Sequence, residues 1–186
     1  MVEQQDFRRV LGHFTTGVAV VAACAGGQPY GFAVNSFVSV SLDPPLVAFC
    51  VAHTSTTWPL MRDAEGFAIS LLGAEQEHVC RVFATKGADR FAGLSWSASP
   101  GGHPIMDDAI GWLDCVPEAV HRAGDHDLVL VRVTVLGGGD GDAPLIFHRG
   151  RFGRLADTIT TSARFDPRDT IDLESPFFPA IAAHLD

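Results

Sequence analysis

The sequence predicts a mainly β protein, an antiparallel β-barrel with a few flanking helices. Two observations support this prediction. Seven or so short runs rich in β-branched and aromatic residues are separated by glycine, proline and other turn residues, which is typical of antiparallel strands. Helical periodicity is confined to a few short segments, so a barrel is favoured over a doubly wound sheet with alternating helices.

Length and composition indicate one domain. With 186 residues and 47% hydrophobic content, the chain can bury one core. We expect a domain over residues 1–155 and an extension over 156–186 that packs on the barrel or a partner subunit, or is partly disordered. The net charge of -9 argues against nucleic acid and membrane surfaces as partners. No apolar run has signal-peptide or membrane-spanning length, so a cytoplasmic location is expected.

The first third of the chain predicts one helix and three strands. Residues 3–14 are expected to form an amphipathic helix, because apolar residues recur there at helical spacing: Phe7, Val10, Leu11 and Phe14. Strands are predicted over residues 17–24, 30–42 and 45–52. The turn "GGQP" separates the first two, and Asp43-Pro44-Pro45 ends the second.

The remaining elements follow from capping, periodicity and turn chemistry. A short helix should begin near Ser55, because Ser and Thr favour helix starts and Pro59 fits a first turn. A strand is expected over 66–73, then a helix over 74–84 with Val79, Val82 and Phe83 facing inward. Strands over 112–123 and 126–138 flank a Gly-Asp turn, and 144–155 completes the β content.

Several common sites are missing from the sequence. It contains no G-x-G-x-x-G after a strand, no Walker A motif, no H-E-x-x-H and no G-x-S-x-G. The four cysteines form no C-x-x-C pair, so isolated thiols are expected. Residues His121, Asp125, His126 and Asp127 offer nitrogen and oxygen donors, but their spacing matches no established metal motif. We predict no metal.

The stretch "VNSFVSVSLDPPLVAFC" places many hydroxyls in a strand-like run. Simple alternation puts Asn35, Phe37, Ser39 and Ser41 on one face and Ser36 with the apolar set. Two interpretations remain open: a solvated face, or a wall that hydrogen-bonds a planar ligand rich in heteroatoms.

A second hydroxyl-rich stretch, "STTW", stands at the predicted helix start. Ser55, Thr56 and Thr57 suit a phosphate, since hydroxyls and free N–H groups gather there, although ordinary capping needs only one of them. Lys86 and Arg90 are the nearest candidates in sequence for the opposing charge, and surface solvation explains single basic residues equally well.

These motifs occur together in a known family. The segments "FRRVLGHFTTGVAVV", "GFAVNSFVSVSLDPPLVAFC", "STTW", "FATKGADRFAGLSW", "PIMDDAIGWLDC", "GDHDLVLVRV" and "PLIFHRGRFGRL" run in family order over roughly residues 7–155. The chain resembles the flavin reductase family with the FMN-binding split-barrel fold, the small reductase components of two-component flavin-dependent monooxygenases.

The resemblance implies a homodimer of Greek-key split barrels that binds FMN or FAD and reduces it with NADH or NADPH for a separate oxygenase component. The absence of an arginine cluster for a 2′-phosphate favours NADH. His126 is the implied catalytic residue, on the nicotinamide side together with Phe152. The implied flavin-binding positions are Ala33, Val34, Asn35, Ser36, Ser39, Val40, Ser41, Cys50, Val51, Ser55, Thr56, Thr57, Lys86, Arg90 and Phe91.

The residue types suit this chemistry. Hydride passes directly from a nicotinamide to the flavin, so the protein needs no nucleophile or metal, only alignment of two rings and stabilisation of the developing charge. We expect His126 to orient the nicotinamide. Thr56 stands where relatives often carry a basic residue, which leaves the FMN or FAD preference open. The alternatives are a non-catalytic flavin carrier or sensor, and an oxidase of a pyridoxal-type vitamer, which would need a stronger basic cluster.

Overall fold

The structure, a computed structural model, describes residues 1–87, 89–138 and 143–155. The predicted extension over 156–186 lies outside this part of the chain. The main sheet is formed by β2 (Ala19–Ala25), β3 (Gln28–Val34), β4 (Val38–Leu42), β5 (Pro45–Ala52), β6 (Phe67–Leu71), β9 (Gly111–Ala123) and β10 (His126–Gly138). Their order across the sheet is β3-β2-β6-β9-β10-β5-β4, and all neighbours are antiparallel.

Two small sheets and three helices complete the described chain. One sheet joins β1 (Thr16–Gly17), β11 (Ile146–His148) and β12 (Arg151–Gly153), and the other joins β7 (Trp96–Ala98) to β8 (Pro104–Met106). The helices are α1 (Gln4–Leu11), α2 (Trp58–Met61) and α3 (Glu77–Ala84). Within the described residues, no helix has the length and apolar character needed to cross a membrane.

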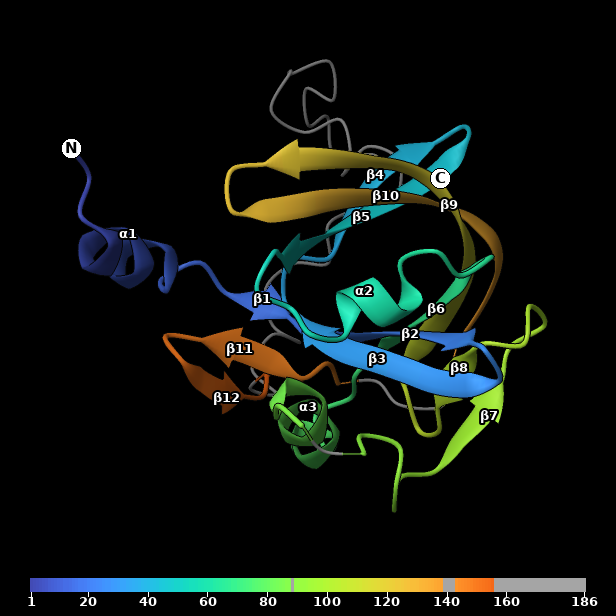
Figure 1. The fold of residues 1–186 in the computed structure, drawn as a ribbon. Helices are drawn as coiled ribbons and strands as arrows, with labels where there is room; N and C mark the ends of the chain where they lie inside the picture. Colours follow the sequence, from blue (N-terminus) through green and yellow to red (C-terminus); the bar gives the residue numbers. More distant parts are fainter. Residues whose placement is uncertain (88, 139–142, 156–186) are drawn as a thin grey trace, which may run out of the picture.

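The large sheet curls into an open barrel, which confirms the predicted fold class. β3 and β4 are consecutive in the chain yet lie at opposite edges of the sheet. Figure 1 shows the β4, β5 and β10 side facing the β2 and β3 side, with β6 and β9 joining them and α2 in the opening between. The barrel interior therefore lies directly beneath α2.

Aromatic packing holds α2 in that opening. The ring of Trp58 stacks on Phe67 with centroids 5.9 Å apart, and it meets Phe32 and Phe49 edge to face at 6.3 Å each. Trp58 and Met61 are buried in the barrel core. Burial of these large side chains and their edge-to-face geometry stabilise one placement of the helix. The residues just before α2, Ser55 to Thr57, are thereby held at the mouth of the barrel.

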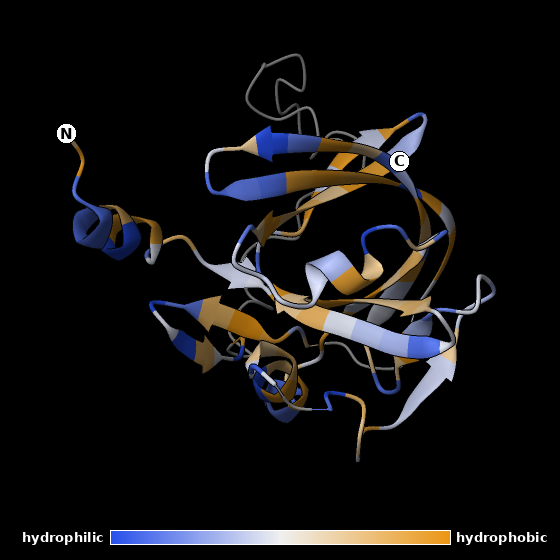
Figure 2. Cartoon of the chain, viewed as in Figure 1, coloured by the Kyte–Doolittle hydropathy of each residue, from blue (hydrophilic) through white to orange (hydrophobic). Residues whose placement is uncertain are grey.

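Strand β2, next to the edge strand β3, is buried on both faces. Ala19, Val21 and Ala23 face the barrel core, while Val20 and Ala22 join a second core with α3. This explains why β2 reads as a continuous apolar run rather than an alternating one. Figure 2 shows hydrophobic residues along the middle of the sheet and hydrophilic ones at the turn between β9 and β10.

Several predicted boundaries need correction. Residues 30–42 do not form one strand: β3 ends at Val34, β4 begins at Val38, and the chain crosses between opposite sheet edges in the intervening residues. Alternation over Asn35 to Ser41 is therefore wrong. The short helix begins at Trp58 rather than near Ser55, and the first helix ends at Leu11 rather than residue 14. The buried face of α3 carries Val79, Cys80 and Phe83, whereas Val82 is half-buried.

Candidate functional site

Arg90 links three separate segments at the barrel mouth. Its Nη1 donates to Thr57 Oγ1 at 2.7 Å and to the Gly31 carbonyl at 2.6 Å, while Nε donates to the Thr85 carbonyl at 3.0 Å. These bonds connect β3, the residues before α2 and the end of α3. Desolvation by burial lowers the pKa of the Arg90 guanidinium below its ordinary value. An anion beside it would stabilise the positive charge that loss of solvation destabilises.

A cavity of about 680 Å³ opens beside this guanidinium. It brings together four of the predicted flavin-binding residues, Thr56, Thr57, Arg90 and Phe91. Lys86 is exposed and lies outside the lining. The remaining lining residues, which are not among the predicted flavin-binding positions, are Gln28, Pro29, Tyr30, Gly31, Leu60, Gly87, Asp89 and Ala92.

The three hydroxyls before α2 differ in the hydrogen bonds that they make. Ser55 Oγ accepts from the Trp58 backbone N–H at 3.1 Å, and Thr57 Oγ1 accepts from Arg90. Both fix local structure. Thr56 is exposed and lines the cavity. Thr57 lines the cavity as well but is half-buried, so Thr56 is the more exposed of the two.

In the serine-rich stretch, Ser36 supports the backbone of β5. Its Oγ accepts a hydrogen bond from the Cys50 N–H at 2.9 Å and donates one to the Cys50 carbonyl at 3.4 Å. In the gap between β3 and β4, these two bonds take the place of the bonds that a neighbouring strand would make. Asn35 is exposed and lines a smaller cavity beside α1. The Ser36 hydroxyl therefore has a structural partner already.

The other predicted flavin-binding positions in β3, β4 and β5 differ in whether their side chains are buried or exposed. Val34 and Val51 are buried in the barrel core, and Ala33 packs toward the second core, so a ligand near them meets backbone. In β4, Ser39 and Ser41 are half-buried and Val40 is about half exposed. The register with β5 shifts between Ser39 and Ser41, which indicates a bulge there.

His126 is the first residue of β10 and pairs with Ala52 at the end of β5. Its Nδ1 lies 2.7 Å from Asp125 Oδ1, and this hydrogen bond lowers the pKa of Asp125. The Asp125 side chain is 94% exposed. His126 thus stands at the tip of the β9–β10 hairpin, with a partner from the same turn.

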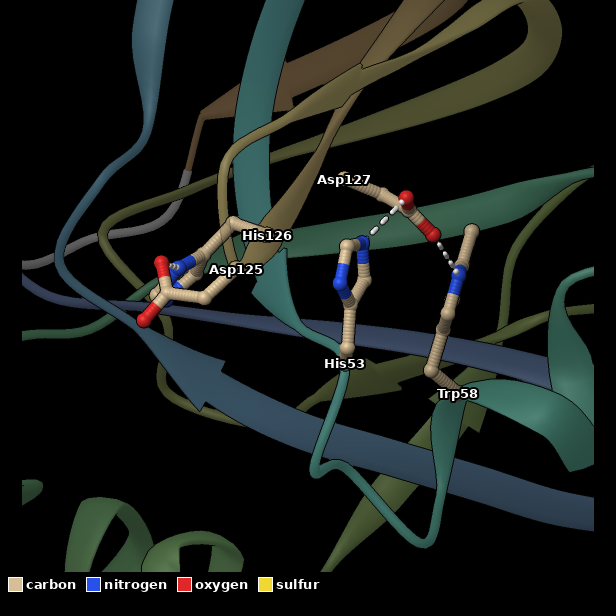
Figure 3. Close-up of polar contacts among 5 residues, drawn as sticks. All are labelled: His53, Trp58, Asp125, His126 and Asp127. Atoms are coloured by element: carbon tan, nitrogen blue, oxygen red, sulfur yellow. Dashed lines mark hydrogen bonds and ion pairs between the residues drawn. The ribbon is translucent and has the colours of Figure 1, made fainter.

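A second histidine, His53, connects this hairpin to the residues before α2. Figure 3 shows His53, Trp58 and Asp127 side by side, with His126 and Asp125 to one side. His53 Nε2 lies 2.9 Å from Asp127 Oδ1, and Trp58 Nε1 donates to Asp127 Oδ2 at 3.2 Å. The His53 backbone N–H also donates to the Asp125 carbonyl at 2.9 Å. Hydrogen bonding by His53, and then by Trp58, lowers the pKa of Asp127.

The sequence alone does not predict a role for this cluster. It offers Asp127 only as a metal donor, and nothing in it singles out His53. The available signal was weak: His53 follows a predicted strand end, and Asp127 follows a Gly-Asp-His turn. Only the pairing of β5 with β10 makes them neighbours.

Phe152 is placed away from His126 within the chain. It lies on β12, with its ring centroid 5.4 Å from that of Phe147 and the Arg81 guanidinium 5.1 Å from its ring centroid. In Figure 1, β12 and the β9–β10 turn lie on opposite sides of β1. A shared role for Phe152 and His126 stays a prediction.

Comparisons with known proteins identify relatives of this chain. The family model described as "Flavin reductase like domain" matches residues 11–156. A similar relative is the reductase subunit HsaB of a flavin-dependent monooxygenase from Rhodococcus jostii (strain RHA1), 39% identical over 87% of this chain and 83% of its own. Another is the FMN reductase (NADH) SmoA of Agrobacterium fabrum, 41% identical over 82% of this chain and 86% of its own.

A solved structure shows the same fold. It is the NADH:FAD oxidoreductase SgcE6 of Streptomyces globisporus C-1027, in complex with NAD and FAD fragments. The two chains superpose with a TM-score of 0.78 and 35% sequence identity, covering 84% of this chain and 97% of the other.

Proposed function

This chain belongs to the flavin reductase-like family, and we propose that it transfers hydride from NADH, or NADPH, to FMN or FAD and supplies the reduced flavin to an oxygenase component. It is an oxidoreductase that uses flavin and NADH. The family comparisons favour this activity over a non-catalytic flavin carrier.

One structural observation carries the proposal. Ala52 pairs with His126, and five residues later Thr57 accepts a hydrogen bond from Arg90. An extended chain of five residues spans at most ~18 Å, so the nicotinamide-side and phosphate-side residues stand at the two ends of one short segment. A single flavin lying along this segment would meet both.

In this arrangement, the bound flavin supplies the hydride acceptor and the dinucleotide supplies the hydride. The chain's own residues bind and orient. Arg90 and Thr56 hold the flavin phosphate, and the Ser39 to Ser41 stretch lies along the flavin. His126 orients the nicotinamide ring from the hairpin tip. Hydride transfer takes no proton from the enzyme, so positioning is the main demand on these side chains.

The test is direct. Purified protein is mixed with NADH or NADPH and either FMN or FAD, and the loss of the reduced-nicotinamide absorbance is followed. We expect flavin-dependent oxidation, faster with NADH. Bound flavin that neither dinucleotide reduces would instead support the carrier alternative.

We also propose the homodimer. The apolar side chains of α1 and the residues after it, Phe7, Val10, Leu11 and Phe14, are all more than half exposed. On the edge strand β4, Val38, Val40 and Leu42 are about half exposed. A second copy covering these surfaces would remove them from water. Sedimentation should give twice the monomer mass, and Phe7→Glu with Leu11→Glu should shift the protein toward monomer.

The remaining assignments follow from this proposal. Residues 1–155 are proposed to be the reductase domain. Because reduced nicotinamide is supplied inside the cell, we propose a cytoplasmic location; the four cysteines are free, as expected in a reducing compartment. The oxygenase component is a separate protein that takes up the reduced flavin.

A further inference from the structure

The turn between β7 and β8, residues 99–103, is docked against the main sheet by buried polar groups. Within this β7–β8 turn, Ser99 Oγ accepts a hydrogen bond from the His103 N–H at 3.0 Å, and the Ser99 N–H donates to the His103 carbonyl at 2.8 Å. The Gly101 N–H donates to Asp114 Oδ2 on β9 at 2.5 Å. The exposed fractions of Ser99, His103 and Asp114 are 6%, 8% and 3%. The β7–β8 turn therefore places an ionisable ring inside the protein.

The His103 ring joins the β7–β8 turn to β2. Its Nδ1 accepts a hydrogen bond from the Cys24 backbone N–H, with 3.3 Å between the two nitrogens. The Nε2 side of the ring lies against Gly66, because a Cβ built on Gly66 would stand 2.7 Å from Nε2. A backbone N–H only donates, so Nδ1 can accept this bond only while it carries no proton. The bond to Cys24 therefore requires a neutral His103 ring with its proton on Nε2.

Burial opposes a positive charge on this ring. The titratable residues on the elements packed against it are Cys24 on β2, Glu65 just before β6, and Asp114 and Cys115 on β9. Desolvation lowers the pKa of His103, and the carboxylates of Asp114 and Glu65 offset only part of this effect. Burial, and then the nearby Asp114, raises the pKa of the Cys115 thiol to about 12, so this thiol is uncharged at neutral pH. The neutral ring thus stabilises the docked turn above the ordinary histidine pKa of ~6.5, and this contribution is lost as the pH falls below that value.

The β7–β8 hairpin also packs against the segment that carries Arg90. Trp96 on β7 meets the Phe91 ring edge to face with 5.8 Å between centroids, and Phe91 meets Phe83 of α3 at 5.1 Å. Trp96 pairs with Met106 on β8, which is buried in the second core together with Phe91. Phe91 lines the cavity beside the Arg90 guanidinium. Because closely packed side chains transmit displacements, movement of this hairpin would reach the cavity through Phe91.

We propose that His103 is an acid-sensitive switch of the β7–β8 hairpin. At neutral pH the ring accepts a hydrogen bond from Cys24 and holds the β7–β8 turn against β2 and β9. When Nδ1 takes up a proton, two donors face each other and a charge is buried, so the turn detaches and the ring reaches water. The segment with Phe91 and Arg90 then loses a packing partner, and flavin binding weakens. This last step rests on the proposed function, whereas the switch itself rests on the geometry of the ring.

The protonation of the ring is tested in the unmodified protein. Proton–nitrogen correlation NMR of labelled histidine side chains reports the tautomer and the titration of each ring. His103 should be the tautomer with its proton on Nε2, and it should titrate below the ordinary histidine pKa of ~6.5. A proton on Nδ1 at neutral pH, or titration at or above that value, would overturn the proposal.

Hydrogen exchange measures detachment of the turn. The protection factors of the Cys24 and Gly101 amides should fall about fivefold or more between ~pH 7.5 and ~pH 5.5, because a ring in water becomes protonated there. His103→Asn keeps an acceptor close to the position of Nδ1 but does not titrate in this range, so its protection factors should be independent of pH. His121→Asn is the matched control, because His121 is an exposed histidine of β9, and it should behave as the wild type. Protection that is constant in the wild type, or that falls equally in His103→Asn, would contradict the switch.

Flavin titration tests the last step and separates it from the reductase activity. Between ~pH 7.5 and ~pH 5.5, the dissociation constants for FMN and FAD should rise about threefold more in the wild type than in His103→Asn. If the amides respond to acid but flavin affinity changes alike in both proteins, the switch stands and its link to the flavin cavity fails. If the affinities differ as expected but neither NADH nor NADPH reduces the bound flavin, the reductase proposal fails and the switch stands.

Discussion

Arg90 and His126 stand at opposite ends of the proposed flavin groove, and they are held in different ways. Arg90 is half-buried and makes three hydrogen bonds, two of them to segments distant in sequence. The bond of His126 to Asp125, its neighbour in the chain, lies at an exposed hairpin tip. The proposed phosphate end is therefore preformed, whereas the proposed nicotinamide end depends on the placement of a hairpin.

His53 and Asp127 reduce this difference. Asp127 joins the hairpin to His53 and Trp58, and Trp58 is packed in the barrel core. The hairpin is thus anchored through one carboxylate close to its tip. The contrast suits the chemistry, because the dinucleotide must reach a flavin that is already in place for hydride transfer, before the reduced flavin passes to the oxygenase component. The following variants test each end in turn.

The largest effect is expected from Arg90→Ala. It removes the cation that is proposed to hold the flavin phosphate, together with its three hydrogen bonds within the protein. A hydrogen bond to a charged group typically contributes about 1.5–3 kcal/mol. Flavin dissociation constants, measured by fluorescence quenching, should rise by about tenfold or more. Arg90→Lys should fall in between, because it keeps the charge but not the planar donor arrangement. Unchanged affinity in Arg90→Ala would remove Arg90 from the phosphate site.

His126→Ala should affect the other substrate. Steady-state kinetics should show a KM for NADH raised, or a kcat lowered, by several-fold (about threefold to tenfold), with flavin affinity nearly unchanged. His126→Asn keeps a polar hydrogen-bonding group, so its KM for NADH and its kcat should change less than those of His126→Ala. If flavin affinity fell in parallel with NADH kinetics, His126 would lie on the flavin side instead.

Asp127→Asn tests the anchor of the hairpin. The folded pKa of Asp127 is below its ordinary value, so its ionised form stabilises the fold above about pH 3.9, and this contribution is lost as pH falls through the folded pKa. The wild type should therefore exceed the variant in urea resistance at neutral pH, and the difference should vanish in strong acid.

The same variant should raise the KM for NADH about twofold, because the hairpin that carries His126 is less firmly held. Asp125→Asn is the control for stability, since exposed ion pairs contribute little. A stability difference that grows on acidification would show that Asp127 acts in another way.

The smallest effects are expected before α2. Ser55→Ala should lower the free energy of unfolding by about 1 kcal/mol, because it removes the acceptor for the Trp58 N–H. Thr56→Ala should leave stability unchanged and weaken flavin binding by about threefold. Denaturation and flavin titration of both variants should show this division, and the reverse pattern would exchange their roles. The double variant Ser55→Ala with Thr57→Ala should weaken flavin binding while scarcely changing hydride transfer.

Local sequence patterns predicted the helices and strands well where each pattern corresponds to a single element. The β9–β10 hairpin followed from two β-rich runs around a Gly-Asp turn, and α3 followed from its helical periodicity. The run over 30–42 was misjudged because two strands at opposite edges of the sheet are separated by only Asn35 to Phe37. A period of two residues cannot reveal such a crossing, since each half matches a strand.

The sequence by itself determined the antiparallel barrel and the likeness to flavin reductases, and it suggested the residues that are proposed to bind flavin and nicotinamide. Only the tertiary structure decided which groups they meet. Arg90 bonds to Gly31 across 59 positions, and His53 meets Asp127 across 74. The Ser36 hydroxyl bonds to the backbone of Cys50, and the cavity beside Arg90 extends along β3 to Gln28. The physical reason is that periodicity records which face of an element is apolar, whereas hydrogen-bond partners distant in sequence are set by strand pairing and packing.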